Sequence, residues 1–238
     1  MPSPFNTGTL TRPEQGIVDP SGQYLYVSSN VINVPGSSSG SLSGVLGYSI
    51  DSATGNLTPL ANSPFGMPSN GQPTQLAFDP TGHFLYVVLT STSSIAGFVK
   101  DPTTGELTAM VGSPFLSESS ANLQTIAIAV HPSGMFLYAL NVNAKSLSAF
   151  TIDSTTGALS PIAGSPFSAP NAGGTAIGID PSGKYLYVTA YGTGAMSIAL
   201  DSMLIYSVNA TTGALSQVSG SPVAMPETIY NFTIVQAP

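Results

Sequence analysis

The stretch Asp180-Pro-Ser-Gly-Lys-Tyr-Leu-Tyr-Val188 recurs in near copies that begin at Asp19, Asp79 and His131 of the 238-residue chain. Each copy opens with a Pro-(Ser/Thr)-Gly turn, in which Pro presets φ and Gly is free to take a positive φ. The turn leads into aromatic and β-branched residues that are typical of a strand. The four copies therefore predict one β-hairpin that is repeated along the chain.

Two further markers follow the same spacing of 50 to 60 residues. The first is Ser-Pro-Phe, which begins at Ser3, Ser63, Ser113 and Ser165, with a Ser-Pro-Val variant at Ser221. The second has the form Asp/Asn-x-x-Thr-Gly-x-Leu and begins at Asp51, Asp101, Asp153 and Asn209. The acidic or amide side chain that opens this marker can accept hydrogen bonds from the backbone of its own turn, so each copy predicts a second hairpin turn.

These markers predict four short antiparallel strands in each repeat. In the third repeat the strands are expected at residues 125–130, 136–140, 147–152 and 158–161. Four strands in about 50 residues are typical of a β-propeller blade. We therefore predict an all-β single domain over residues 1–238, with complete blades at about 13–61, 73–111, 123–162 and 173–218. Residues 219–238 would begin a fifth blade with an inner strand at 230–236, which indicates an incomplete ring.

The aromatic and leucine side chains of the hairpins are expected to form the core between blades. The predicted buried set is Tyr26, Leu85, Leu137 and Leu186, with Ile128 and Ile177 on the inner strands.

Composition excludes several classes of function. The net charge is −7 and the chain has only four basic residues, so binding to a phosphate backbone is not expected. No Cys is present, and each turn that opens with Asp51, Asp101 or Asp153 offers one carboxylate, so we expect no metal site and no cofactor. No apolar run has the length of a membrane span.

The N-terminal residues lack the charged and apolar regions of a signal peptide. This pattern is expected of a cytoplasmic protein. It is equally expected of an extracellular, cell-surface or periplasmic protein whose leader precedes the sequence given.

The three markers together resemble the YVTN-type repeats of the lactonase-like β-propeller family, and the resemblance covers nearly the whole chain. Members of this family usually have seven blades, and its enzymes place acidic, basic and His side chains around the mouth of the central channel. The resemblance implies the propeller fold and, for activity, the opening of a lactone ring.

Candidate site residues are expected where the loops vary in length, at the end of each blade opposite the tight hairpins. Glu14 is the candidate general base and Arg12 the candidate electrostatic stabiliser of a lactonase. Candidate ligand-binding residues are Glu118, Lys145, Tyr191 and Asp201. His83 and His131 lie in tight hairpins, so we expect structural or solvent-exposed roles for both.

Two functions remain open from the sequence. The favoured one is a non-catalytic propeller that binds a neutral ligand, such as a small molecule or carbohydrate, or a protein partner through charge-poor loops. The alternative is a lactonase-like hydrolase. In either case, apolar blade edges without a polar cap predict self-association.

Overall fold

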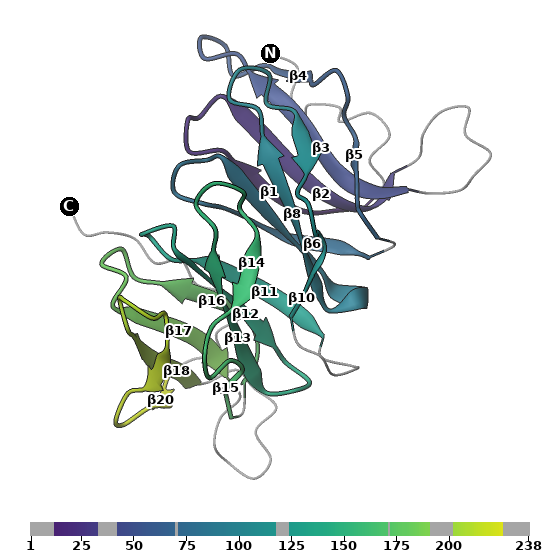
Figure 1. Cartoon of the computed structure of the whole chain (residues 1–238). Helices are drawn as coiled ribbons and strands as arrows, with labels where there is room; N and C mark the ends of the chain where they lie inside the picture. Colours follow the sequence, from purple (N-terminus) through teal and green to yellow (C-terminus); the bar gives the residue numbers. More distant parts are fainter. Residues whose placement is uncertain are drawn as a thin grey trace. The chain divides into compact units, whose positions relative to one another are not determined.

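Within the residues that it describes, a computed structural model of the chain contains four antiparallel β-sheets and one short 3₁₀ helix (Figure 1). The described residues are 12–32, 42–69, 71–117, 124–170, 172–190 and 202–225. The chain divides into two compact units, Met1–Phe115 and Leu116–Pro238. Sheets 1 and 2 belong to the first unit, and sheets 3 and 4 belong to the second.

The first unit contains ten strands in the described residues. Sheet 1 consists of β1 (Pro13–Val18), β2 (Tyr24–Ile32), β3 (Leu42–Ile50), β4 (Leu57–Pro59) and β5 (Phe65–Gly66). Sheet 2 consists of β6 (Pro73–Phe78), β7 (Phe84–Leu89), β8 (Ser94–Lys100), β9 (Leu107–Ala109) and β10 (Phe115–Leu116), with the helix η1 (Thr90–Thr92) between β7 and β8. The inner strands β1 and β6 lie beside each other.

The second unit repeats this arrangement. Sheet 3 consists of β11 (Thr125–Val130), β12 (Phe136–Asn141), β13 (Ser146–Ile152), β14 (Leu159–Pro161) and β15 (Phe167–Ser168). Sheet 4 consists of β16 (Ala172–Ile179), β17 (Tyr185–Ala190), β18 (Ser202–Val208), β19 (Leu215–Gln217) and β20 (Val223–Ala224). Here the inner strands β11 and β16 are neighbours.

The all-β prediction is confirmed, and the strands expected in the third repeat match β11 to β14 to within one residue at each end. The part of the chain that the structure describes contains no helix with the length and hydrophobicity needed to cross a membrane. The inner strand predicted at 230–236 lies outside the described residues.

The Ser-Pro-Phe marker forms a strand that the sequence did not predict. In sheet 3, β14 pairs with one end of β13 and β15 pairs with the other end, so the outermost strand is split into two pieces. The same split occurs in the other three sheets, where β5, β10 and β20 take the place of β15. The segment was expected to be only a connection between blades, because a strand of two residues has no detectable alternation of polar and apolar positions.

The serine of this marker supplies a hydrogen-bond acceptor at the point where the outer strand is interrupted. Its hydroxyl oxygen accepts a hydrogen bond from a backbone N–H of the adjacent long strand, at 2.8 to 3.0 Å, in all four sheets. The donor–acceptor pairs are Gly47–Ser63, Gly97–Ser113, Ala149–Ser165 and Ile205–Ser221. A backbone donor that would otherwise be left without a partner is thereby satisfied.

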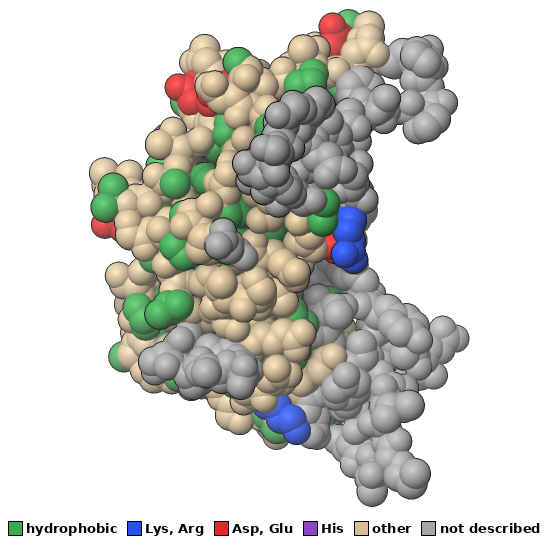
Figure 2. Space-filling model, turned by 90° about the vertical axis from the view of Figure 1, so that its right-hand side faces the viewer, with side chains coloured by type: hydrophobic (Ala, Val, Ile, Leu, Met, Phe, Trp, Pro, Cys, Tyr) green, Lys and Arg blue, Asp and Glu red, His purple; other side chains and the backbone are tan. Residues whose placement is uncertain are grey.

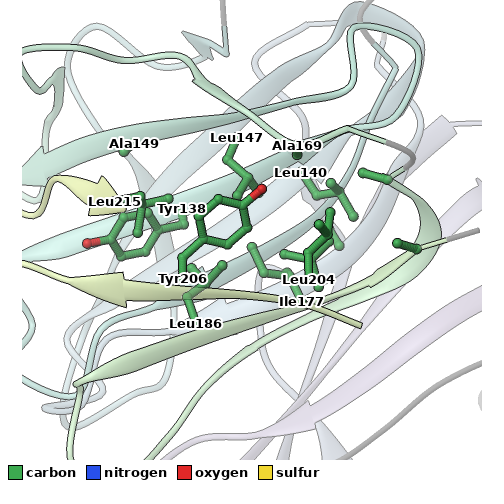
Figure 3. Packing of buried hydrophobic residues seen from close by; sticks show 14 of the residues in the cluster. Tyr138, Leu140, Leu147, Ala149, Ala169, Ile177, Leu186, Leu204, Tyr206 and Leu215 are labelled. Carbon is green, nitrogen blue, oxygen red and sulfur yellow. The ribbon is translucent and has the colours of Figure 1, made fainter. Parts of the chain in front are cut away.

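Hydrophobic side chains fill the space between the two sheets of each unit. Figure 3 shows this core in the second unit, where Tyr138, Leu140 and Leu147 of sheet 3 pack with side chains of sheet 4. All six residues predicted to be in the core are buried, with exposed fractions between 0 and 8%. The proposed strand register is therefore confirmed at these positions.

Tyrosine hydroxyls link the two sheets within each unit. Tyr26 Oη donates to the carbonyl of Gly105 at 2.5 Å, and Tyr138 Oη donates to the carbonyl of Gly213 at 2.8 Å. The acceptors belong to the Thr-Gly turns of sheets 2 and 4. Burial raises the pKa of both phenols, so they stay protonated as donors.

A buried ion pair adds a second link in the first unit. Lys100 Nζ lies 3.2 Å from Asp19 Oδ2, and both residues are at most 5% exposed. Burial by itself raises the pKa of the Asp19 carboxyl. The hydrogen bonds from Ser21 and the Tyr24 N–H, together with the Lys100 ammonium, outweigh burial and lower this pKa below its ordinary value.

The second unit forms the equivalent link with a histidine. His131 replaces the aspartate that opens the hairpin, and it is 6% exposed. Its Nδ1 accepts from the Ser133 N–H at 3.1 Å, so Nε2 carries the proton and donates to the Gly183 carbonyl at 2.9 Å. His83, in contrast, is exposed and contacts Phe84 edge to face.

Truncating a buried leucine of a central strand should destabilise the protein strongly. Leu137 in β12 is fully buried, so Leu137→Ala is expected to lower the free energy of unfolding by about 2–5 kcal/mol in a reversible denaturant titration. Val111→Ala is the control, because Val111 is 96% exposed. A loss below about 0.5 kcal/mol for Leu137→Ala would contradict the packing described.

Breaking the buried ion pair should make stability less dependent on pH. Because the pKa of Asp19 is lower in the folded state, the pair stabilises the protein above about pH 4 and this contribution is lost as the pH falls through the folded pKa. Asp19→Asn leaves the Lys100 ammonium buried without its counter-ion, and is expected to cost about 3–5 kcal/mol at neutral pH. The difference from wild type should shrink below about pH 4.

The matched variant for this test is Lys100→Ile. The corresponding positions of the other sheets hold Ile50, Ile152 and Val208, so an aliphatic side chain fits this place in the strand. The double variant Asp19→Asn/Lys100→Ile should be more stable than Asp19→Asn alone. Equal stability of the single and double variants would show that the ion pair is not the cause of the loss.

Candidate functional site

Each sheet has one end with tight turns and one end with loops that differ between repeats. The turns between β1 and β2 and between β3 and β4 are closed by backbone hydrogen bonds such as Gly22 N–H to the Asp19 carbonyl, at 2.9 Å. We call the opposite end, where β1 begins and β2 ends, the loop end. The loops at this end differ in length and sequence between repeats, as loops that form binding sites commonly do.

Glu14 lies at the loop end of β1 and its side chain is exposed. Its Oε1 accepts a hydrogen bond from Asn30 Nδ2 at 2.6 Å. The pairing of β1 with β2 is irregular between Pro13 and Gly16, and such an irregularity changes the direction in which side chains point. A carboxylate held by an amide and open to solvent is suited to accept a proton from water.

Arg12 directly precedes β1 and is exposed. Its carbonyl oxygen accepts from the Ser29 hydroxyl at 3.0 Å and from the Asn30 N–H at 3.2 Å. The backbone of Arg12 is therefore fixed, while the guanidinium forms no ion pair with a carboxylate of the described residues. A guanidinium that is not paired with a carboxylate can stabilise negative charge that develops on the oxygen atom of a ligand.

Asn30 is a further candidate site residue, which the sequence did not indicate. It contacts both candidates, through Nδ2 to Glu14 and through its backbone N–H to Arg12. Its Oδ1 is buried and has no hydrogen-bond partner among the described residues. No sequence pattern points to Asn30. Its contact with Glu14 depends on the irregular pairing of β1 with β2, which is visible only once the strand register is known.

Two further side chains attach this site to the neighbouring sheet. Gln15 Oε1 accepts from the Leu76 N–H, and the Ser28 hydroxyl donates to the Thr74 carbonyl at 2.6 Å. Ser28 Oγ also accepts from the Gln15 N–H at 3.2 Å. These bonds hold the first strand against β6, so Arg12 and Glu14 project from a rigid support.

None of the remaining candidates belongs to the first unit, which contains Glu14. Lys145 belongs to the second unit, where it lies in the turn between β12 and β13 with φ of 50° and an exposed side chain. Glu118, Tyr191 and Asp201 lie outside the described residues. They stay predictions.

Few basic side chains lie at the loop ends of the sheets. All four basic residues of the chain are described. Lys100 is buried with Asp19, and Lys184 is exposed in a tight hairpin, so Arg12 and Lys145 are the cations at the loop ends. Figure 2 shows a face on which charged side chains are few.

A buried polar cluster lies at the loop end of sheet 3. Asn141 Nδ2 donates to the Ser148 hydroxyl at 2.7 Å, and Asn141 Oδ1 accepts from the Thr125 hydroxyl at 2.8 Å. All three residues are fully buried, so a ligand cannot reach them directly. Among the described residues no group of three His, Cys, Asp or Glu side chains could hold a metal ion.

Comparison with known proteins identifies the family of this fold. The chain matches the family described as "Lactonase, 7-bladed beta-propeller" over residues 16–121 and 128–228. No match was found among curated protein sequences.

Solved structures with the same fold include a putative 6-phosphogluconolactonase from Bacteroides uniformis, which is 18% identical with a TM-score of 0.74. The alignment covers 92% of this chain and 59% of that chain. A periplasmic gluconolactonase from Pseudomonas aeruginosa is also 18% identical, with a TM-score of 0.67 and coverage of 92% and 57%. The present chain thus spans a little more than half the length of these structures. At this identity the structures show the fold alone, and the family match over most of the chain shows that it belongs to the lactonase family of seven-bladed β-propellers.

Proposed function

We propose that this protein is a lactone hydrolase with Glu14 as general base and Arg12 as electrostatic stabiliser. The observation that carries the proposal is the exposed Glu14 carboxylate held by Asn30 at 2.6 Å, with the guanidinium of Arg12 two residues away on the same strand end. The family match favours this function over the non-catalytic binding module that composition favoured.

The proposed reaction is the addition of water to the lactone carbonyl. Glu14 takes a proton from water while the water oxygen bonds to the carbonyl carbon, and the guanidinium of Arg12 stabilises the resulting oxyanion. The ring C–O bond then breaks, and the proton held by Glu14 passes to the leaving alkoxide. The product is a hydroxy acid, which ionises at neutral pH.

The proposed substrate is a lactone without a phosphate group. A phosphorylated substrate is bound most effectively by several cations, and Arg12 is the one basic residue of the first unit at its loop end. The net charge of −7 also disfavours the approach of a phosphorylated lactone. An uncharged sugar lactone would be held by hydrogen bonds from polar loop residues.

We further propose a location outside the cytoplasm. The support is the likeness of the fold to the periplasmic gluconolactonase from P. aeruginosa. Fractionation of the source cells, with detection of the protein in the periplasm or medium, is the measurement that checks it.

The roles of Glu14 and Arg12 can be tested with a panel of unphosphorylated sugar lactones and the purified chain. Glu14→Gln is expected to lower kcat by about 10²–10⁴-fold, because it removes the base. Arg12→Ala should lower kcat by about 10²-fold or more. Glu106→Gln is the control, since Glu106 is a carboxylate of sheet 2 that binds Asn62 away from the loop end.

Three outcomes would contradict the proposal. Activity that persists in Glu14→Gln and Arg12→Ala would exclude their assigned roles. Hydrolysis that requires a phosphorylated lactone would contradict the proposed substrate. A wild type that binds sugars or lactones without hydrolysing them would support the non-catalytic module instead.

Asn30 is proposed as a positioning residue for Glu14. Asn30→Ala should lower kcat about tenfold with little change in KM, because the carboxylate is then free to rotate away from the water. The free energy of unfolding should change by less than about 1 kcal/mol, since the lost bond is at an exposed site. A loss of stability that accounts for the whole loss of activity would show a structural role only.

A further inference from the structure

The contact between neighbouring sheets has the same chemistry in both units. In the first unit, Tyr24 Oη donates to the Thr103 carbonyl at 2.6 Å and Tyr26 Oη donates to the Gly105 carbonyl. The Tyr24 ring also lies so close to Gly105 that a Cβ placed on this glycine would be 2.4 Å from it. The hairpin of one sheet therefore fits closely over the Thr-Gly turn of the next.

In the second unit the same fit is formed by Phe136 and Tyr138. Tyr138 donates to the Gly213 carbonyl, and a Cβ placed on Gly213 would lie 2.6 Å from the Phe136 ring. Phe136 and Tyr138 are 3% and 0% exposed. One interface thus occurs twice, each time with an aromatic pair on one side and a Thr-Gly turn on the other.

Sheet 4 carries the aromatic half of this interface without its partner. Tyr185 and Tyr187 occupy the register positions of Tyr24 and Tyr26. Tyr185 is 41% exposed, whereas Tyr24 is 7% exposed. Neither the Tyr185 nor the Tyr187 hydroxyl has a hydrogen-bond partner among the described residues, although this hydroxyl is bonded in Tyr24 and Tyr26.

Sheet 1 carries the other half of the interface without its partner. Gly55 is the glycine of its Thr-Gly turn, and a Cβ placed there would meet no atom within 4 Å. The face of sheet 1 that points away from sheet 2 is covered only in part, since Leu46 and Tyr48 are buried there but the side chains at its β1 edge are not. Val18 on this face is 49% exposed and Leu25 is half-buried, whereas Leu186, at the same register position as Leu25, is fully buried.

We propose that sheet 4 of one copy of this chain docks on sheet 1 of a second copy, head to tail. Tyr187 donates to the carbonyl of Gly55 in the second copy, and Tyr185 packs over the same turn and donates to the Ala53 carbonyl. A second copy is the occupant that fits, because one chain carries both complementary halves and each half is known from an interface formed within the chain. The docking does not depend on the proposed catalytic activity.

The test is sedimentation velocity of the purified 238-residue chain over a dilution series. Wild type is expected to dissociate on dilution. Tyr187→Phe removes only the hydroxyl and should raise the dissociation constant about tenfold. Gly55→Asn keeps a residue that tolerates positive φ but places a side chain against Tyr185 of the partner copy, so it should abolish association.

Matched variants at the internal interface separate docking from folding. Tyr138→Phe should lower the stability of the fold and leave the dissociation constant unchanged. Gly105→Asn should destabilise the fold itself, because Tyr24 already fills this space, while Gly55→Asn should not. A circular dichroism spectrum of Gly55→Asn that matches wild type shows that loss of association is not unfolding.

Cross-linking gives an independent readout because the chain contains no cysteine. A copy with Ala53→Cys mixed with a copy with Lys184→Cys, an exposed position next to Tyr185 that keeps both tyrosines, should form a dimer with a short bis-maleimide reagent. Each variant alone should not. A wild type that is monomeric at all concentrations, or cross-links that form equally in every mixture, would overturn the proposal.

Discussion

Sheets 1 and 3 bury their hairpin aromatics by packing against the Thr-Gly turn of the next sheet in the same unit. The tyrosine hydroxyl fixes the distance between the sheets, since Tyr26 and Tyr138 reach backbone carbonyls of Gly105 and Gly213. The glycines are required by geometry as well as by conformation, because they combine a positive φ with direct contact to an aromatic ring. Variation in length is therefore confined to the opposite end of each sheet, where Arg12 and Glu14 lie.

The residue that opens the first hairpin turn of a sheet is linked to the next sheet in two different ways. Asp19 accepts hydrogen bonds from its own turn and pairs with Lys100, while His131 accepts through Nδ1 and donates through Nε2 to Gly183. The aspartate can only accept, so its neighbour must supply a donor, and the histidine can link to a carbonyl directly. Lys100 is thereby withdrawn from any role in binding an anionic ligand.

Much of the fold could be predicted from the sequence, because the turn markers recur and each hairpin marker leads into aromatic and β-branched residues. The strands of the third repeat and the six core residues were predicted correctly. The split outer strand was missed, since it depends on a bond from Ser165 to a backbone N–H that lies 16 residues earlier in the chain. Glu14 and Arg12 could be placed at the loop end by counting strands. Asn30 could not, because its contact with Glu14 follows from an irregular register.

The divided outer strand has a consequence for solubility in a chain with few charges. A continuous outer strand would offer a row of unpaired N–H and C=O groups to any extended peptide, and this is how sheets recruit one another into aggregates. Here each outermost strand is divided into one piece of three residues and one of two residues. A proline, which has no N–H to donate, directly precedes each two-residue piece. The edge is thus a poor template for β-strand addition, so a protein with only 6% charged residues is protected from fibril growth by its backbone rather than by surface charge.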